Sequence, residues 1–424
     1  MDGPAKQSNL HPCKPLNTLF SSLPTTIFSV MSQLAVAHNS VNLGQGFPDE
    51  EGPAEMKRLA GQTLFDHHNQ YPSLLGVPEL RQAVARHSER YTGVVVDWQT
   101  EALVTVGATE GIAAALLGLI NPGDEIIMFD PMYDSYVSMA KRSGANIVPV
   151  KLSLPNFSVP REELAAAFGP NTKVSDAPVM FKTIPQQPEL PSWSTPPHNP
   201  SGVVFSRSDM EFIAQLCCQH DAIALCDEVY QHQVFGGAEH VSLRSLPGML
   251  NRSIVMGSAG KTFSFTAWKV GWMTGPAALL SPIIKAHQFL VFTVAPSLQR
   301  AVAHGLDNEA GFYRSLGPSL ERKRSLLAGT LSAIGFTVLP GNGAYFLVAD
   351  ASSFLKPGET DTEFAIRLTV EAGVTCIPIS GFYVSPSPPV HLVRFCYCKE
   401  DEKLISAGER LATYFNAQAA LVAQ

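Results

Sequence analysis

The sequence predicts an α/β protein in which a mostly parallel β-sheet lies between helices, accompanied by a smaller α+β domain. Short apolar runs alternate with helix-length stretches from about Val41 onward. A long helix-like segment that begins near Ser315 leads into a second, separate set of apolar runs. Strands that alternate with helices of this length form βαβ units, which place their strands parallel in one sheet.

The elements of the larger unit follow one another in chain order, after a polar arm and a helical stretch at 25–39. The predicted strands lie at 103–106, 125–129, 146–151, 222–226 and 253–256, and the predicted helices lie at 110–120, 133–142, 161–168 and 209–220. Ligands gather beyond the carboxyl ends of the strands in sheets of this kind, so a site is expected at that edge.

The smaller unit follows the long helix. Its predicted strands lie at 336–339, 345–349 and 392–396, and a helix closes the chain. The sequence therefore divides into an amino-terminal arm with part of the small domain (1–45), a large domain (46–305) and a small carboxyl-terminal domain (306–424).

Composition and charge narrow the classes of function. Of the 424 residues, 45% are hydrophobic, which is enough for a sizeable core. The formal net charge is −7 and there is no basic stripe, so nucleic acid is not an expected partner. Seven scattered cysteines without a CxxC pair indicate reduced thiols and no metal site. The absence of an apolar run long enough for a membrane span, and of a secretory leader, predicts a cytoplasmic protein.

The segment Ser258-Ala-Gly-Lys261 follows a predicted strand. A lysine at a strand end is partly shielded from water, which lowers its pKa and makes its amine nucleophilic toward an aldehyde. Most lysines are solvated surface charges, so Lys261 alone decides little. The spacing also matches the SxxK of serine acyl-transferases, but the SDN and KTG elements of those enzymes do not occur in the sequence.

Two further strand ends carry polar side chains. Asp227 and Tyr230 follow the apolar run AIALC, and Asn199 lies in the turn His198-Asn-Pro-Ser-Gly. A carboxylate at a strand end can pair with a buried cation, and the amide and phenol can donate to an oxygen. The alternative for Asp227 is an ordinary carboxylate that caps a helix, and for Asn199 a plain turn.

An anion site is expected where the strand at 103–106 runs into a helix. Gly107 and Ala108 leave backbone N–H groups exposed at the helix amino terminus, and Thr109 adds a hydroxyl. Ser258 and Lys269 are candidate donors to the same anion. The run is neither GxGxxG nor a Walker loop, so neither a dinucleotide nor a nucleoside triphosphate is indicated. The alternative for Thr109 is a simple helix N-cap.

Two more residues follow from their apolar surroundings. Tyr133 comes after the apolar run EIIMF, where it can stack on a flat ligand or fill the core. Arg394 lies within HLVRFCY, and a charge in such a run needs a partner. Its partner is either the carboxylate of a substrate or a structural salt bridge. Phe47 and Phe292 are candidate aromatic residues of a pocket.

These residues, taken in order, resemble the class I/II aminotransferases of fold type I, which depend on pyridoxal phosphate. The likeness runs over residues 25–415 and is strongest to the kynurenine, glutamine and methionine aminotransferase group. It is carried by VNLGQGFPDEEGP, NQYPSLLGVPELR, PHNPSG, CDEVY, GSAGKTFSFTAWKVGW and LVRFCYCK. The resemblance implies a seven-stranded sheet in the large domain, a homodimer with composite sites, and transfer of an amino group from such amino acids to a 2-oxo acid.

The resemblance also implies a role for each candidate. Lys261 carries the cofactor as a Schiff base and moves the substrate's proton, Asp227 pairs with the pyridine nitrogen, and Asn199 and Tyr230 bind the phenolic oxygen. The remaining roles are stacking on the ring by Tyr133, phosphate binding by Ala108, Thr109, Ser258, Lys269 and, from the neighbouring subunit, Tyr71, and substrate binding by Gly46, Asn199 and Arg394. A β-lyase acting on cysteine conjugates shares this cofactor and is the alternative activity.

One segment departs from the family pattern. Residues 174–196 contain five prolines and no clear strand, where relatives have a short buried strand before the PHNPSG turn. Proline removes ladder donors, and loss of a central strand would open the core. The sequence allows either a splice or gene-model artefact, with impaired catalysis, or a surface insertion in which part of VMFKTI supplies the strand.

Overall fold

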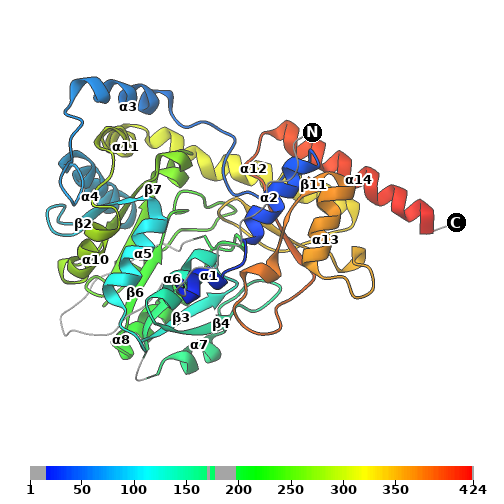
Figure 1. The fold of residues 1–424 in the computed structure, drawn as a ribbon, viewed down its shortest axis with the longest axis horizontal. Coiled ribbons are helices and arrows are strands. Elements are labelled where there is room, and N and C mark those ends of the chain that lie inside the picture. Colours follow the sequence, from blue (N-terminus) through cyan, green and yellow to red (C-terminus); the bar gives the residue numbers. More distant parts are fainter. Residues whose placement is uncertain (1–15, 170–171, 177–196, 423–424) are drawn as a thin grey trace.

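The structure is a computed structural model that describes residues 16–169, 172–176 and 197–422. Its centre is a seven-stranded sheet (Figure 1). In sheet order the strands are β2 (Ala102–Val106), β8 (Val270–Thr274), β7 (Ser253–Ser258), β6 (Ile223–Asp227), β5 (Thr172–Asp176), β3 (Glu125–Asp130) and β4 (Asn146–Lys151). Only β8 runs antiparallel to its neighbours. The predicted mostly parallel sheet is therefore confirmed.

The strands are apolar along their whole length because both faces of the sheet are covered. Successive side chains point to opposite faces. Ile126 and Met128 of β3 join a core formed with α5 (Gly107–Leu119), α6 (Asp134–Arg142) and α10 (Ala277–Leu290). Ile127 and Phe129 join the larger core on the other face, which the remaining helices of the large unit help to form. These are α3 (Ala54–Asp66), α4 (Pro78–Thr92), α7 (Arg161–Ala167), α8 (Arg207–Gln219) and α11 (Pro296–Asn308).

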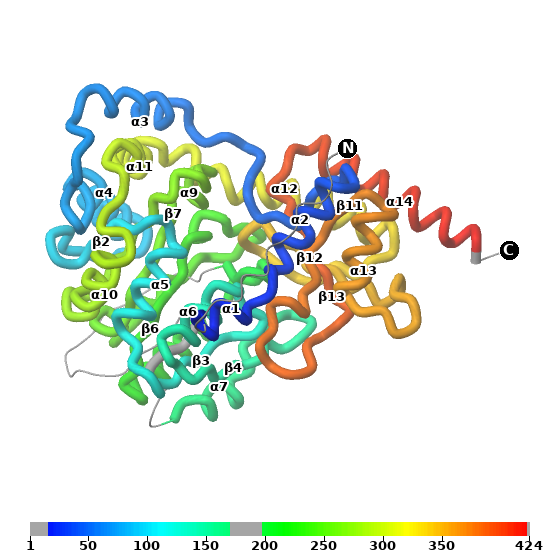
Figure 2. Tube along the Cα trace, viewed as in Figure 1, coloured from blue at the N-terminus to red at the C-terminus, as the bar shows by residue number. Residues whose placement is uncertain are grey.

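A second, four-stranded antiparallel sheet lies beside the first. Its order is β12 (Ile377–Pro378), β13 (Leu392–Cys396), β10 (Phe346–Asp350) and β9 (Thr337–Val338). The long helix α12 (Ala310–Ile334) leads to it from the large sheet, and α13 (Asp361–Arg367) and α14 (Asp401–Val422) complete this part (Figures 1 and 2). The predicted α+β unit after the long helix is thus present. The domain boundaries given above remain a prediction.

The amino-terminal arm contributes to the small unit. After α1 (Thr18–Ser22), α2 (Ile27–Ala37) leads into β1 (Val41–Asn42), which pairs in parallel with β11 (Val374–Thr375). Two residues paired in this way are a weak link by themselves. Residues 42–49 then run toward the large sheet, and side chains of the small unit hold them there, as described below.

The expectation that residues 174–196 hold no strand is wrong for their first three residues. Residues Val174, Ser175 and Asp176 belong to β5, which pairs with both β3 and β6. The strand begins at Thr172, before the proline-rich run, so the centre of the sheet keeps its backbone pairing. The run VMFKTI and the rest of 177–196 lie outside the described residues. The structure therefore does not test whether this segment is a splice or gene-model artefact.

A further strand, β8, was not predicted from the sequence. This strand is short, and Gly271 interrupts its apolar pattern. Glycine is required there: a Cβ on Gly271 would lie 2.7 Å from the carbonyl carbon of Gly107 at the start of α5. In the part of the chain that is described, no helix is long and apolar enough to cross a membrane.

Candidate active site

A cavity of about 540 Å³ lies at the carboxyl edge of the large sheet, where β6 ends at Asp227 and β7 at Ser258. This volume suits a small-molecule site. Eleven of the twelve predicted site residues line it: Gly46, Ala108, Thr109, Tyr133, Asn199, Asp227, Tyr230, Ser258, Lys261, Lys269 and Arg394. Tyr71, the twelfth, does not.

Lys261 lies in α9 (Ala259–Thr262), the short helix that begins directly after β7. Ser258 is its N-cap, and the hydroxyl of Ser258 accepts a hydrogen bond from the backbone N–H of Gly260 at 3.2 Å. Lys261 Nζ donates to the Tyr345 hydroxyl at 2.6 Å and to the Gly46 carbonyl oxygen at 3.3 Å. Burial lowers the pKa of Lys261 to about 8. Roughly one tenth of the amines are therefore neutral at pH 7, compared with less than about one in a thousand for a solvated lysine.

The carboxylate of Asp227 has few hydrogen-bond donors around it. Burial raises its pKa, and the hydrogen bond from the Tyr136 hydroxyl to Oδ2, at 2.6 Å, opposes that rise. The backbone N–H of Val229 approaches Oδ1 at 3.4 Å. Asp227 does not cap a helix, because turns follow it. A small void beside it has mostly apolar walls: Ile112, Leu116, Met128, Leu225 and Met256. A carboxylate so placed gains most from a cationic partner in the cavity.

Asn199 and Tyr230 flank the same space. Asn199 Oδ1 accepts a hydrogen bond from Arg394 Nη1 at 2.8 Å. Arginine can only donate, so the amide N–H₂ of Asn199 is the end left to donate to a ligand. Tyr230 is buried, its ring meets the edge of the Tyr345 ring at 5.4 Å, and burial raises the pKa of its phenol. Both side chains can therefore donate to an oxygen in the cavity.

The amino terminus of α5 forms an anion cradle. Gly107 has a φ of +67°, and a Cβ there would lie 3.2 Å from Lys269 Nζ, which places this ammonium group over the start of the helix. Unpaired N–H groups of a first helical turn and a nearby ammonium attract a phosphate. Thr109 is not the N-cap, contrary to the alternative above. That position is Val106, so Thr109 lies in the first turn.

Arg394 is almost fully buried in β13, with 1% of its surface exposed. It donates to Asn199 and, through Nη2, to the Gly44 carbonyl oxygen at 2.9 Å. The rings of Phe346 and Phe382 lie 4.4 and 4.9 Å from its guanidinium carbon. Among the described residues no carboxylate forms a salt bridge with it, so the structural ion pair considered above is not found there. A buried guanidinium that lines a cavity and forms no salt bridge with any described carboxylate can bind the carboxylate of a ligand.

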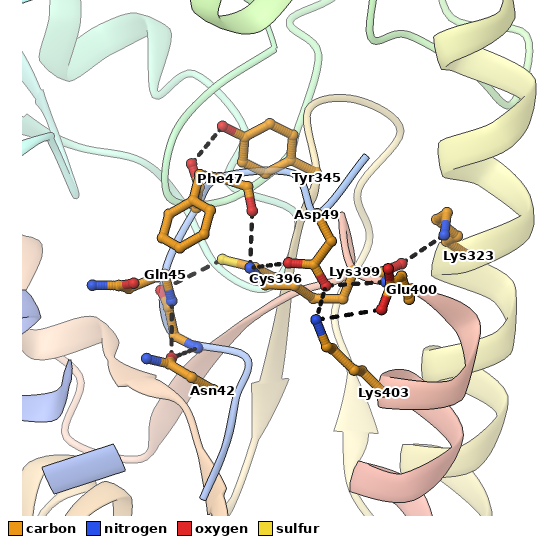
Figure 3. A network of polar contacts seen from close by, with 12 residues as sticks. Asn42, Gln45, Phe47, Asp49, Lys323, Tyr345, Cys396, Lys399, Glu400 and Lys403 are labelled. Carbon is orange, nitrogen blue, oxygen red and sulfur yellow. Dashed lines mark hydrogen bonds and ion pairs between the residues drawn. The ribbon is translucent and has the colours of Figure 1, made fainter. Parts of the chain in front are cut away.

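Residues 42–49 form the cavity-lining loop. Side chains of the small unit hold this loop by donating hydrogen bonds to its backbone carbonyl oxygens. Figure 3 shows the side chains around Phe47 and Asp49. Lys399 Nζ donates to the Phe47 carbonyl oxygen at 2.9 Å and to Asp49 Oδ1 at 3.2 Å. The Tyr345 hydroxyl donates to the Gly46 carbonyl oxygen at 2.7 Å. Neither Lys399 nor Tyr345 was predicted as a site residue, because the only local signal of each is a polar group within or beside an apolar run.

Of the two aromatic residues predicted to line a pocket, only one lines this cavity. Phe47 lines the cavity, whereas Phe292 does not and instead meets Tyr71, with ring centroids 5.2 Å apart. Tyr71 is 81% exposed. A contribution from Tyr71 to a cavity would have to be made to a neighbouring molecule.

Comparison with known proteins matches this geometry to one family. The family model for aminotransferase class I and II matches residues 38–411. The probable N-succinyldiaminopimelate aminotransferase DapC of Mycobacterium tuberculosis is 40% identical over 400 residues, which cover 92% of this chain and 96% of that protein. The methionine aminotransferase of Escherichia coli is 37% identical, covering 92% and 96%. Kynurenine–oxoglutarate transaminase 3 of Rattus norvegicus is 34% identical, covering 92% and 88%.

Solved structures agree. The N-succinyldiaminopimelate aminotransferase of M. tuberculosis superimposes with a TM-score of 0.86 at 38% identity, covering 94% of this chain and all of that one (100%). YbdL of E. coli, for which a methionine aminotransferase function is identified, gives 0.86 at 35% identity, covering 95% and 100%. The chain therefore belongs to the class I and II aminotransferases, the pyridoxal-phosphate-dependent transaminases of fold type I.

Proposed function

We propose that this aminotransferase takes its amino group from large neutral amino acids of the kynurenine, aromatic, methionine or glutamine type. The observation that carries the proposal is the charge of the cavity wall. Its described lysines and arginines are Lys261, Lys269 and Arg394, and the first two belong to the cofactor's part of the site. That leaves a single cation for the carboxylate that every amino acid carries. Phe28, Phe47 and Phe346 supply an aromatic wall for the rest of the substrate.

The residues present fit pyridoxal phosphate. When bound, the cofactor supplies an aldehyde that condenses with amines and a ring that accepts electrons from the α-carbon of the substrate. In our assignment Lys269, Ser258, Thr109 and the N–H of Ala108 hold the phosphate at the amino terminus of α5. Asp227, whose charged form the hydrogen bond from Tyr136 favours, would pair with the pyridine nitrogen. The remaining assignments are Asn199 and Tyr230 for the phenolic oxygen and Tyr133 for the ring face.

Lys261 then acts as the base. With a pKa near 8, its Nζ is neutral often enough near physiological pH to accept the proton that the α-carbon of the substrate releases. Nζ lies in the cavity with its hydrogen bonds to Tyr345 and Gly46, so the proton stays within the site for return.

Arg394 is proposed to clamp the substrate carboxylate, and Arg394→Lys tests this. We expect kcat/KM for all amino donors to fall by on the order of 30- to 1000-fold, because an ammonium cannot make the two parallel hydrogen bonds and leaves Asn199 or Gly44 unpaired. Steady-state kinetics check it. Arg322→Lys, an exposed arginine paired with Asp401 at 2.6 Å, is the control and is expected to change little. An unaltered kcat/KM in Arg394→Lys would refute the assignment.

We also propose that two copies assemble and that Tyr71 of one reaches the phosphate of the other. Supporting this, two other large apolar side chains are as exposed as Tyr71: Phe65 at 86% and Phe289 at 84% exposure. Apolar side chains this exposed are typical of surfaces that a partner covers. Sedimentation at micromolar concentration should give twice the chain mass of 45.7 kDa, and a single-chain mass would contradict the proposal.

A donor panel tests the function itself. Kynurenine, phenylalanine, methionine and glutamine are compared with aspartate and N-succinyldiaminopimelate, using 2-oxoglutarate and pyruvate as acceptors. Neutral donors should give a kcat/KM at least about tenfold higher, because a second carboxylate would lack a cation in the cavity and cost about 1.4 kcal/mol or more. A preference for the dicarboxylic donors would overturn the proposal.

The same assay separates the alternatives. Pyruvate and ammonia released from a cysteine conjugate in the absence of an acceptor would show the β-lyase reaction. A preparation with no visible absorption from bound cofactor would show an impaired protein.

A further inference from the structure

Tyr345 contacts both the lysine assigned as the base and the cavity-lining loop. It precedes β10 directly, is fully buried, and comes from the small unit, whereas Lys261 comes from the large one. Its hydroxyl lies 2.6 Å from Lys261 Nζ and 2.7 Å from the Gly46 carbonyl oxygen. Figure 3 shows this side chain directed at the cavity-lining loop.

The direction of each hydrogen bond follows from the proton count. A phenol has one proton, for which the Gly46 carbonyl oxygen and the Tyr230 hydroxyl oxygen compete, whereas an ammonium group can only donate. The lone pairs of the hydroxyl therefore face Lys261, and Nζ is the donor. Because Nζ also donates to the Gly46 oxygen at 3.3 Å, the amine sits between two acceptors that are themselves hydrogen-bonded.

We propose that Tyr345 is a positioning residue that holds the free amine of Lys261 whenever that amine is not bonded to the cofactor. The proposal rests on the role assigned to Lys261 above. Burial lowers the pKa of Lys261 to about 8, and the nearby Asp227 carboxylate opposes that fall whereas Lys269 adds to it. Two acceptors at Nζ favour the ammonium form and act in the same direction as Asp227. Tyr345 thereby keeps the amine near one place and prevents its pKa from falling further.

The test is the uptake of pyridoxal phosphate by the cofactor-free full chain, followed by visible absorption from pH 6 to 10. Uptake needs the neutral amine, so its rate rises with pH through the pKa of Lys261, near 8 in the unaltered protein. In Tyr345→Phe the ammonium loses an acceptor, and we expect the midpoint to fall by about one pH unit. In the reconstituted holoenzyme, kcat should fall more than KM for the donor, because the amine acts in the chemical step.

Tyr397→Phe is the matched control. Tyr397 is also fully buried, and its hydroxyl donates to a backbone oxygen of the same segment, Ala344, at 3.1 Å, without contact to Lys261. It should lose a comparable hydrogen bond and leave the midpoint in place. If Tyr345→Phe does not fold, 3-fluorotyrosine at position 345 keeps the ring and weakens the acceptor, and should move the midpoint in the same direction by less.

The outcomes are distinct. A midpoint that stays in place in Tyr345→Phe, or that moves equally in Tyr397→Phe, overturns the inference while the function stands. An unaltered protein that takes up no cofactor at any pH overturns the proposed function and this inference together.

Discussion

Lys261→Ala is expected to lower kcat by on the order of 10²- to 10⁴-fold or more, since we propose that Lys261 is both the covalent attachment point and the general base. The arginines and other lysines cannot replace it, because Lys261 Nζ is the amine within the cavity whose pKa burial brings to about 8. The visible absorption that the Schiff base gives the holoenzyme should be lost. Borohydride reduction followed by peptide mass spectrometry checks the attachment on position 261.

Lys285→Ala is the control for this prediction. Lys285 is an exposed lysine on α10, away from the cavity, and its removal should leave absorption and kcat unchanged. The assignment fails if Lys261→Ala keeps a cofactor that borohydride fixes to the protein, because another amine would then carry it.

Asp227→Asn is expected to lower kcat by on the order of 100- to 1000-fold and to weaken cofactor binding. Asparagine keeps the shape and can still accept from Tyr136, but it removes the negative charge that would face the pyridine nitrogen. Leaving a buried cation without its partner costs about 3–5 kcal/mol. Steady-state kinetics and a fluorescence titration of the cofactor measure the two effects. Equal kcat in Asp227→Asn and the unaltered enzyme would exclude the charge as a catalytic element.

Tyr136→Phe provides the graded comparison. It leaves the carboxylate of Asp227 but removes the 2.6 Å hydrogen bond that opposes the rise in its pKa. The charged form of Asp227 is then lost at a higher pH, so activity should fall away sooner as the pH is lowered. At neutral pH the loss should be smaller than in Asp227→Asn. A pH–rate profile with an unmoved acid limb would show that Tyr136 does not act through Asp227.

The elements that the sequence predicted best are those in which local pattern and burial coincide. The strands predicted at 146–151 and 392–396 have the same limits in the structure, as β4 and β13. Apolar runs bounded by polar or turn residues mark buried strands, so their ends could be read directly. Strand ends also located the candidate site. Asp227 and Ser258 are the last residues of β6 and β7, and both line the cavity as expected.

Other parts of the fold depended on contacts distant in the sequence. β5 uses Thr172–Asp176, a polar stretch whose place in the sheet is set by β3 and β6 on either side. β8 needs Gly271 because α5 approaches it closely. In both strands the tertiary surroundings outweigh local preference, which is why the local pattern did not reveal them.

The sequence alone determined that Lys261, Asp227, Asn199 and Arg394 lie at strand ends or in buried runs, and their order identified the family. Only the tertiary structure decided what each of them contacts. Arg394 bonds to Gly44 across 350 residues of chain, and Lys261 to Tyr345 across 84. Spacing along a chain fixes which face a residue occupies, but a hydrogen bond requires two atoms within about 3 Å. Whether two such atoms come within this distance depends on how the two sheets pack.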